Sequence, residues 1–134
     1  MNYVFCELKK IETLAEVCED NAMQSPGVFI FSRDGNSITA IGRSEKNVGA
    51  FLRNRFGEFR KKYNFYKVEP TYSSFEAFVL HCRLYHKHLI GEHPEPPREK
   101  QNWSCPVLGC RWEEARKTRI KTPIFRQPAL ANAF

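Results

Sequence analysis

The 134-residue sequence predicts an α+β domain in which helices flank a small, mainly antiparallel sheet of three strands. Two runs rich in Val, Ile, Phe and Thr, residues 27–32 and 37–42, lie on either side of an Asp-Gly pair, which is typical of a β-hairpin. Segments with apolar residues at three- and four-residue spacing precede and follow this hairpin, and this spacing indicates helices.

The remaining elements are predicted from the same two signals, helical spacing of apolar residues and runs rich in strand-forming residues. The apolar spacing predicts helices over residues 7–22, 47–62 and 73–89. A third strand is expected over residues 65–68, closed by Pro70. The proline-rich segment that follows the last helix should be irregular, since proline offers no N–H for a regular backbone ladder. Residues 102–112 are expected to form a compact turn.

Four parts are expected along the chain, distinguished by composition. They are an N-terminal helical segment (1–24), an α+β domain (25–90), an irregular segment rich in Cys and His (91–117), and a basic tail (118–134).

The composition excludes several classes of protein. A hydrophobic content of 42% argues against a disordered chain, and no apolar run approaches the length that spans a membrane. The N-terminus shows no secretory signal, and the five Cys are an odd number, so we expect reduced thiols and a cytoplasmic location.

Positive charge is concentrated in one block. Residues 43–67 carry eight cationic side chains against Glu45 and Glu58, a net charge of +6, and aromatic residues are interleaved with them. Such a block predicts a surface for nucleic acid, because cations displace counterions from phosphates and rings stack on bases. The alternative is a solvated helix face with its rings in the core. The candidate contacts are Arg43, Lys46, Arg53, Arg55, Arg60, Lys61 and Lys62.

The order of the motifs resembles the GIY-YIG nuclease domain over roughly residues 25–90. Gly27-Val28-Phe29 stands where the first triplet would be, and Ala40-Ile41-Gly42 follows after ten residues as the second. A basic amphipathic helix, a third strand and Phe75-Glu76-Ala77 at the start of a later helix complete the resemblance.

The resemblance implies phosphodiester hydrolysis with few parts. In the family, one tyrosine helps to activate water and a second orders the site. An arginine neutralises charge on the phosphoryl group, and a glutamate holds one divalent cation, usually magnesium.

Three of these four positions are substituted in this chain. The tyrosines fall on Phe29 and Ala40, and the arginine falls on Phe51, so only Glu76 survives. Arg43 and Arg55 are the nearest candidates to replace the arginine. We therefore expect a scaffold that binds nucleic acid rather than an efficient enzyme, and we favour DNA over RNA as the nucleic acid that it binds.

Two alternatives stay open at this stage. One is an active magnesium-dependent endonuclease that uses substitute groups. Glu76 also has a purely structural interpretation, because Ser73-Ser74-Phe75-Glu76 matches the capping box that begins many helices.

The late Cys and His residues suggest a zinc site. Cys82 and His86 are four residues apart on a predicted helix, and His93, Cys105 and Cys110 follow. Cys105-Pro106 resembles the start of a zinc knuckle, although its next thiol comes five positions later instead of three. We expect Cys82, His93 and Cys105 to be three of the zinc ligands, and either Cys110 or His86 to be the fourth. The alternative is a set of free thiols. With zinc, a third function is a zinc-fastened domain that binds an acidic protein partner.

Overall fold

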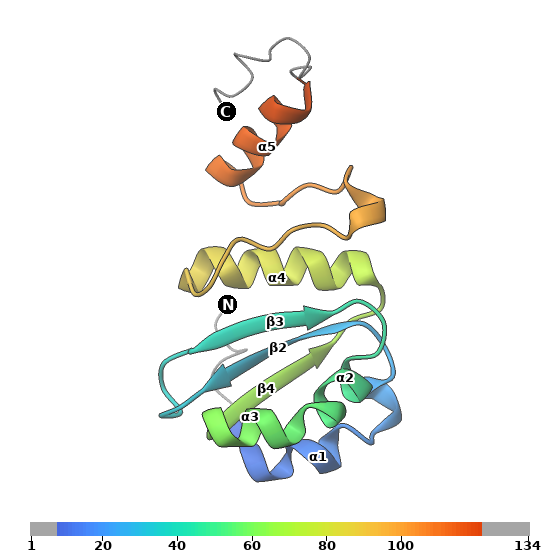
Figure 1. Cartoon of the computed structure of the whole chain (residues 1–134), viewed down its shortest axis with the longest axis vertical. Helices are drawn as coiled ribbons and strands as arrows, with labels where there is room; N and C mark the ends of the chain where they lie inside the picture. Colours follow the sequence, from blue (N-terminus) through green and yellow to red (C-terminus); the bar gives the residue numbers. More distant parts are fainter. Residues whose placement is uncertain (1–7, 122–134) are drawn as a thin grey trace.

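The computed structural model describes residues 8–121, and the side chains of residues 8–116, as a layered α+β fold (Figure 1). The strands are β1 (Lys9–Lys10), β2 (Gly27–Ser32), β3 (Ala40–Ser44) and β4 (Phe65–Pro70). The helices are α1 (Leu14–Val17), α2 (Val48–Asn54), α3 (Phe56–Lys62), α4 (Ser74–His88) and α5 (Arg111–Lys121). Short 3-10 turns are η2 (Ile11–Thr13), η3 (Asn21–Met23) and η4 (Arg98–Lys100).

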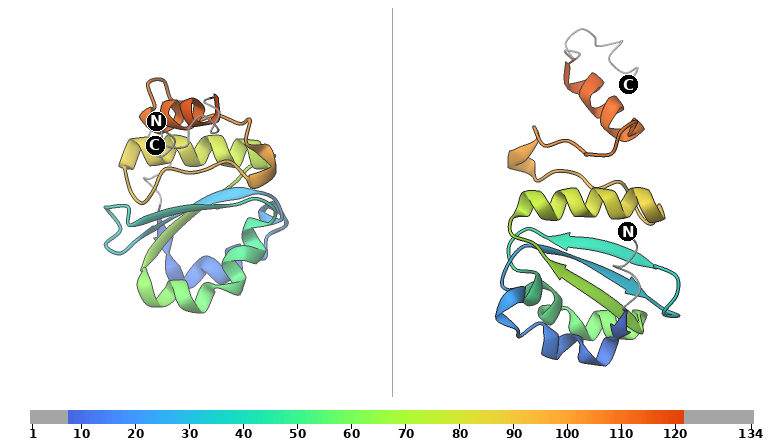
Figure 2. Two further views of the ribbon diagram at one scale, coloured as in Figure 1. Left: turned by 45° about the horizontal axis from the view of Figure 1, so that its top comes forward. Right: turned by 180° about the vertical axis from the view of Figure 1, so that it is seen from behind.

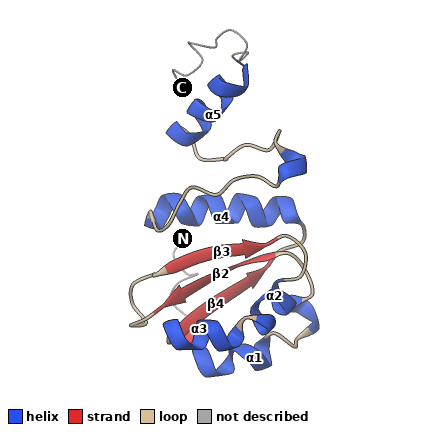
Figure 3. Cartoon of the chain, in the orientation of Figure 1, coloured by secondary structure: helices blue, strands red, loops and turns tan. Residues whose placement is uncertain are grey.

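The sheet has the order β1-β4-β2-β3, and all of its pairings are antiparallel. This confirms the predicted fold class. The three expected strands are β2, β3 and β4 (Figure 3), and the two-residue β1 is added beside β4. None of the described helices combines the length and the apolar character needed to cross a bilayer.

Helices cover both faces of the sheet. α1, α2 and α3 lie against one face and α4 crosses the other, while the irregular chain after α4 and then α5 lie beyond α4 (Figures 1 and 2). β2 is buried along its whole length: Phe29 and Phe31 face the α1–α3 layer, and Val28 and Ile30 face α4. A strand buried on both faces has the continuous apolar sequence seen here.

The second strand of the hairpin begins later in the chain than the sequence predicts. Asp34 Oδ1 accepts the backbone N–H groups of Asn36 and Ser37, each at 2.8 Å, and these bonds lower the pKa of Asp34 to about 2. The turn therefore consumes residues assigned to a strand, and β3 covers 40–44 where 37–42 was expected. Ala40 pairs with Phe31, and Gly42 pairs with Phe29.

The prediction of one long helix over residues 7–22 is wrong, because the structure has β1, η2, α1 and η3 there. Lys9 and Lys10 pair with β4, and Asp20 caps the separate turn η3 by accepting the Ala22 N–H. Only four residues in between are α-helical. The apolar side chains of this N-terminal segment still reach the core, since Ile11 from η2 and Leu14 from α1 lie in one cluster with Phe29.

The helix predicted over residues 47–62 divides at Arg55, where φ is −115° and ψ is 14°. This bend lets Leu52 from α2 and Phe59 from α3 both contact the cluster around Phe29. α4 matches its predicted range within one residue at each end, because Ser73 caps it and Leu89, with φ of 53°, ends it.

The C-terminal part is more regular than expected. The segment after α4 is irregular apart from η4, but α5 begins at Arg111 and continues to Lys121. α5 therefore overlaps the start of the expected tail, and the rest of that tail lies outside the described residues.

Candidate functional site

The two aromatic residues at the family positions are packed against each other. The rings of Phe29 and Phe51 are stacked with centroids 5.6 Å apart, and Phe29 is 7% exposed. The ring of Phe59 also packs near Phe29, with the two ring centroids 6.2 Å apart. This cluster contains no hydroxyl or guanidinium at the positions where the resemblance would require them, and Ala40 adds neither.

Gly42, in the second triplet, is required by this packing. A Cβ at Gly42 would lie 2.6 Å from Cζ of Phe29, which is far inside van der Waals contact. The glycine thus leaves room for the Phe29 ring on the neighbouring strand.

Glu76 forms a helix cap at the start of α4. Its N–H donates to Ser73 Oγ at 3.1 Å, and its Oε1 accepts the Tyr72 N–H at 2.8 Å. The predicted cap is thus present, although the glutamate satisfies Tyr72 instead of Ser73.

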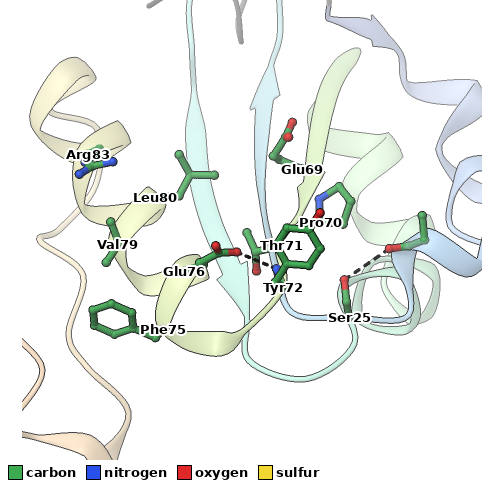
Figure 4. Close-up of a pocket in the computed structure, with 11 residues that line it drawn as sticks. Ser25, Glu69, Pro70, Thr71, Tyr72, Phe75, Glu76, Val79, Leu80 and Arg83 are labelled. Carbon is green, nitrogen blue, oxygen red and sulfur yellow. Dashed lines mark hydrogen bonds between the residues drawn. The ribbon is translucent and has the colours of Figure 1, made fainter.

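Glu76 also lines an open groove of about 790 Å³ at the Gly27–Pro70 end of the sheet (Figure 4). Tyr72, which is 95% exposed, and Phe75 give the groove aromatic walls, and Glu69 and Arg83 add charges of both signs. The structure therefore brings Phe29 and Phe51 together, but it assigns Glu76 to a separate groove on the α4 side.

The groove fits the magnesium ion that the resemblance implies only as a weak site. Magnesium binds proteins through one or two carboxylates and keeps several waters. Glu76 is exposed in the groove, so its carboxylate could offer one ligand to the ion. When bound, it would stabilise charge on a phosphate oxygen.

Arg43 does not lie on the exposed basic surface, contrary to expectation. Its side chain is 10% exposed and pairs with Glu45 at 2.8 Å. Its guanidinium also bonds His81 Nδ1 at 3.0 Å and donates to the Glu95 carbonyl, and it lies over the Phe78 ring. Arg43 thus ties β3 to α4 and to the chain beyond. Burial, helped by the charge of Arg43, lowers the pKa of His81 to about 3.

The other candidate cations are exposed. We define the basic surface as the exposed cations of α2, α3 and the residue between them: Arg53, Arg55, Arg60, Lys61 and Lys62. Arg55 lies 4.1 Å from the Phe51 ring centroid and Arg60 lies 5.7 Å from that of Phe56, so aromatic rings support two of the guanidinium groups. Lys62 forms a loose pair with Glu58, 3.9 Å apart, between exposed side chains. Lys46 is exposed just before α2.

Four of the five candidate zinc ligands converge. The donor atoms of His86, His93, Cys105 and Cys110 all lie within 4.8 Å of one another. The two His Nε2 atoms are 3.3 Å apart. Cys105 Sγ lies 3.5 Å from His86 Nε2, and Cys110 Sγ lies 3.2 Å from His93 Nε2. Cys82, the ligand we favoured, is fully buried beside this group but is not one of its four members.

Two residues that support this cluster were missed in the sequence. The buried Glu113 accepts the Cys105 N–H at 3.1 Å and pairs with Arg116 at 2.6 Å. Arg116 also donates to the Gln101 and Trp103 carbonyls. A Glu three residues after Cys110, and an Arg three residues after that Glu, are the only signal in the sequence, and such spacing is common on any helix.

Comparisons with known proteins yield one structural likeness to report. No family model and no curated protein matches the chain. A search of solved structures finds the GIY-YIG N-terminal endonuclease domain of UvrC from Thermotoga maritima, bound to its catalytic magnesium. The two are 21% identical, the match covers 56% of this chain and 93% of that one, and the TM-score is 0.43.

Proposed function

We propose that this protein is a GIY-YIG nuclease-like domain that binds nucleic acid, DNA ahead of RNA, and cleaves it weakly or not at all. The observation that carries the proposal is the contrast between the two sides of the α2–α3 layer. The inner side holds the stacked Phe29 and Phe51 rings where the family has a tyrosine and an arginine, and the outer side carries the basic surface.

The charges of the basic surface support binding to a phosphate backbone. Among the five cations as described, Lys62 alone has an ion pair, and that pair is exposed and weak. The arginines that stack on Phe51 and Phe56 hold their guanidinium groups close to the helix surface. Ordering these side chains in advance reduces the entropy lost on binding.

Binding of a labelled DNA duplex, followed by fluorescence anisotropy at several salt concentrations, tests the proposal. If all five cations contact phosphates, affinity should fall about 500-fold between about 50 and 200 mM salt. The double variant Arg60→Ala, Lys61→Ala should weaken binding and reduce the slope of log affinity against log salt by about 2.

A matched control removes the same charge elsewhere. Arg98 and Lys100 are exposed on η4, so the double variant Arg98→Ala, Lys100→Ala should leave affinity and slope unchanged. If the two double variants bind equally well, the basic surface is not the binding site. A single-stranded RNA of the same length, measured in parallel, tests the preference for DNA.

An active endonuclease is the second candidate, and the groove favours it. Glu76 is exposed in this groove, as a magnesium ligand would be, and Arg83 lines the same groove with a positive charge. Nicking of supercoiled plasmid that is lost in Glu76→Ala would support this candidate over the first.

A further inference from the structure

We propose that His86, His93, Cys105 and Cys110 form a structural Zn²⁺ site that fastens the irregular chain after α4 to that helix. This inference goes beyond the proposed function, because it concerns neither the basic surface nor the groove of Glu76.

Three of the distances between the donor atoms fit one tetrahedral ion, and all four atoms lie within 4.8 Å of one another. With zinc–nitrogen bonds of about 2.05 Å and zinc–sulfur bonds of about 2.3 Å, tetrahedral geometry separates two nitrogens by about 3.3 Å and a nitrogen from a sulfur by about 3.6 Å. The two His nitrogens are 3.3 Å apart, and the two S···N distances are 3.5 and 3.2 Å.

Hydrogen bonds around the cluster present the correct atoms to a metal. His93 Nδ1 lies 2.7 Å from the Pro94 carbonyl, so the proton belongs on Nδ1 and the lone pair of Nε2 faces the cluster. The Glu113 N–H donates to Cys110 Sγ at 3.3 Å, a hydrogen bond of the kind that orients a metal ligand.

A second layer of contacts holds these ligands in place. The Glu113 carboxylate fixes the backbone of Cys105, and the Trp112 ring stacks on His93 with centroids 4.2 Å apart. Cys105 and Cys110 are 8% and 6% exposed. His86 and His93 are half-buried, and four protein donors leave no open position on a tetrahedral ion for water or substrate, so the ion is structural rather than catalytic.

The ligands come from parts of the chain that need a fastener. His86 lies on α4, His93 on the irregular chain, Cys105 in the turn after η4, and Cys110 just before α5. Between Leu89 and Cys110 the only regular element is η4, so this segment has little hydrogen-bonded secondary structure of its own. A bound metal would supply that missing stability.

Metal analysis of the purified full-length chain is the first test, and we expect one zinc ion per chain. After removal with a chelator, titration with Co²⁺ reports the ligands directly, because each thiolate adds intensity to the sulfur-to-metal charge-transfer band. We expect the intensity of a tetrahedral site with two thiolates. This measurement needs no variant, so it does not depend on a mutant folding.

Variants then separate the four ligands from the neighbouring thiol. Cys110→Ser and His93→Gln should lower zinc affinity by at least about 100-fold, whereas Cys82→Ala should bind zinc as the parent does. Cys18→Ala, a buried thiol in the other core, controls for the loss of any cysteine. No zinc in the parent, an intensity of three thiolates, or loss of zinc in Cys82→Ala would overturn the assignment.

Discussion

The substitution Gly42→Ala tests whether the Phe29 ring packs directly against Gly42 of the neighbouring strand. The added Cβ would lie 2.6 Å from Phe29 Cζ and 2.7 Å from Cε1. The Phe29 ring cannot move away freely, because it stacks on Phe51 and tilts against Phe31 and Phe59, at centroid distances of 5.6, 5.5 and 6.2 Å. Overpacking of this kind costs about 1–3 kcal/mol.

Urea unfolding and thermal melting measure this loss. In a chain of this length, each kcal/mol should lower Tm by about 3–5 °C. The control is Gly57→Ala: Gly57 lies in α3, and an added Cβ has no other atom within 4 Å. This control should gain about 0.5–1 kcal/mol, because alanine is the better helix former.

A double variant shows whether the clash involves the ring. Phe29→Leu removes the atoms that the new Cβ would meet, so it should cost less in Gly42→Ala than in the parent, with a coupling of about 1 kcal/mol or more. If the two costs add, or if Gly42→Ala is as stable as Gly57→Ala, the packing described for the hairpin is incorrect.

Three further outcomes are expected. The pKa of His81 is about 3 in the folded chain, below its ordinary 6.5, so its contribution to stability is full above pH 6.5 and falls toward pH 3 by up to about 1.4 kcal/mol per pH unit. The variant His81→Gln keeps an acceptor for Arg43, and its free energy of unfolding, measured by urea titration at each pH, should fall less steeply with acid. Equal slopes of unfolding free energy against pH in the parent and the variant would contradict this. Ser73→Ala removes the cap of α4 and should cost about 1 kcal/mol in the same assay, and an unchanged midpoint would show that the cap contributes nothing. Removing zinc should speed amide hydrogen exchange in residues 89–110 and leave β2 unchanged, whereas uniform protection with and without metal would argue against a fastening role.

The parts of the fold set by local sequence were predictable. β2 and β4 have β-branched and aromatic runs, and the cap at Ser73 and the apolar spacing define α4. The strand β1 was not predictable, because Lys9 and Lys10 pair with β4 more than fifty residues away. The same pairing shortened the N-terminal helix, although its apolar spacing is helical.

The types of the candidate functional residues were predictable from the sequence, but the contacts between them were not. The sequence indicated that Phe29 and Phe51 replace polar groups, and it indicated a cluster of Cys and His. It could not reveal that Arg43 bonds His81, since this contact depends on how α4 lies on the sheet. Nor could it choose His86 over Cys82, because residues four apart on a helix share a face and only the position of the irregular chain decides between them.

The central claim is that this chain can hold a nucleic acid strand but has lost most of the groups that would cut it. Incubation of supercoiled plasmid with magnesium, at protein concentrations where anisotropy shows the DNA to be bound, tests both halves of that claim in one sample. We predict bound plasmid that stays supercoiled, at the same level as with Glu76→Ala. Efficient conversion to nicked circles by the parent, and not by Glu76→Ala, would contradict the account.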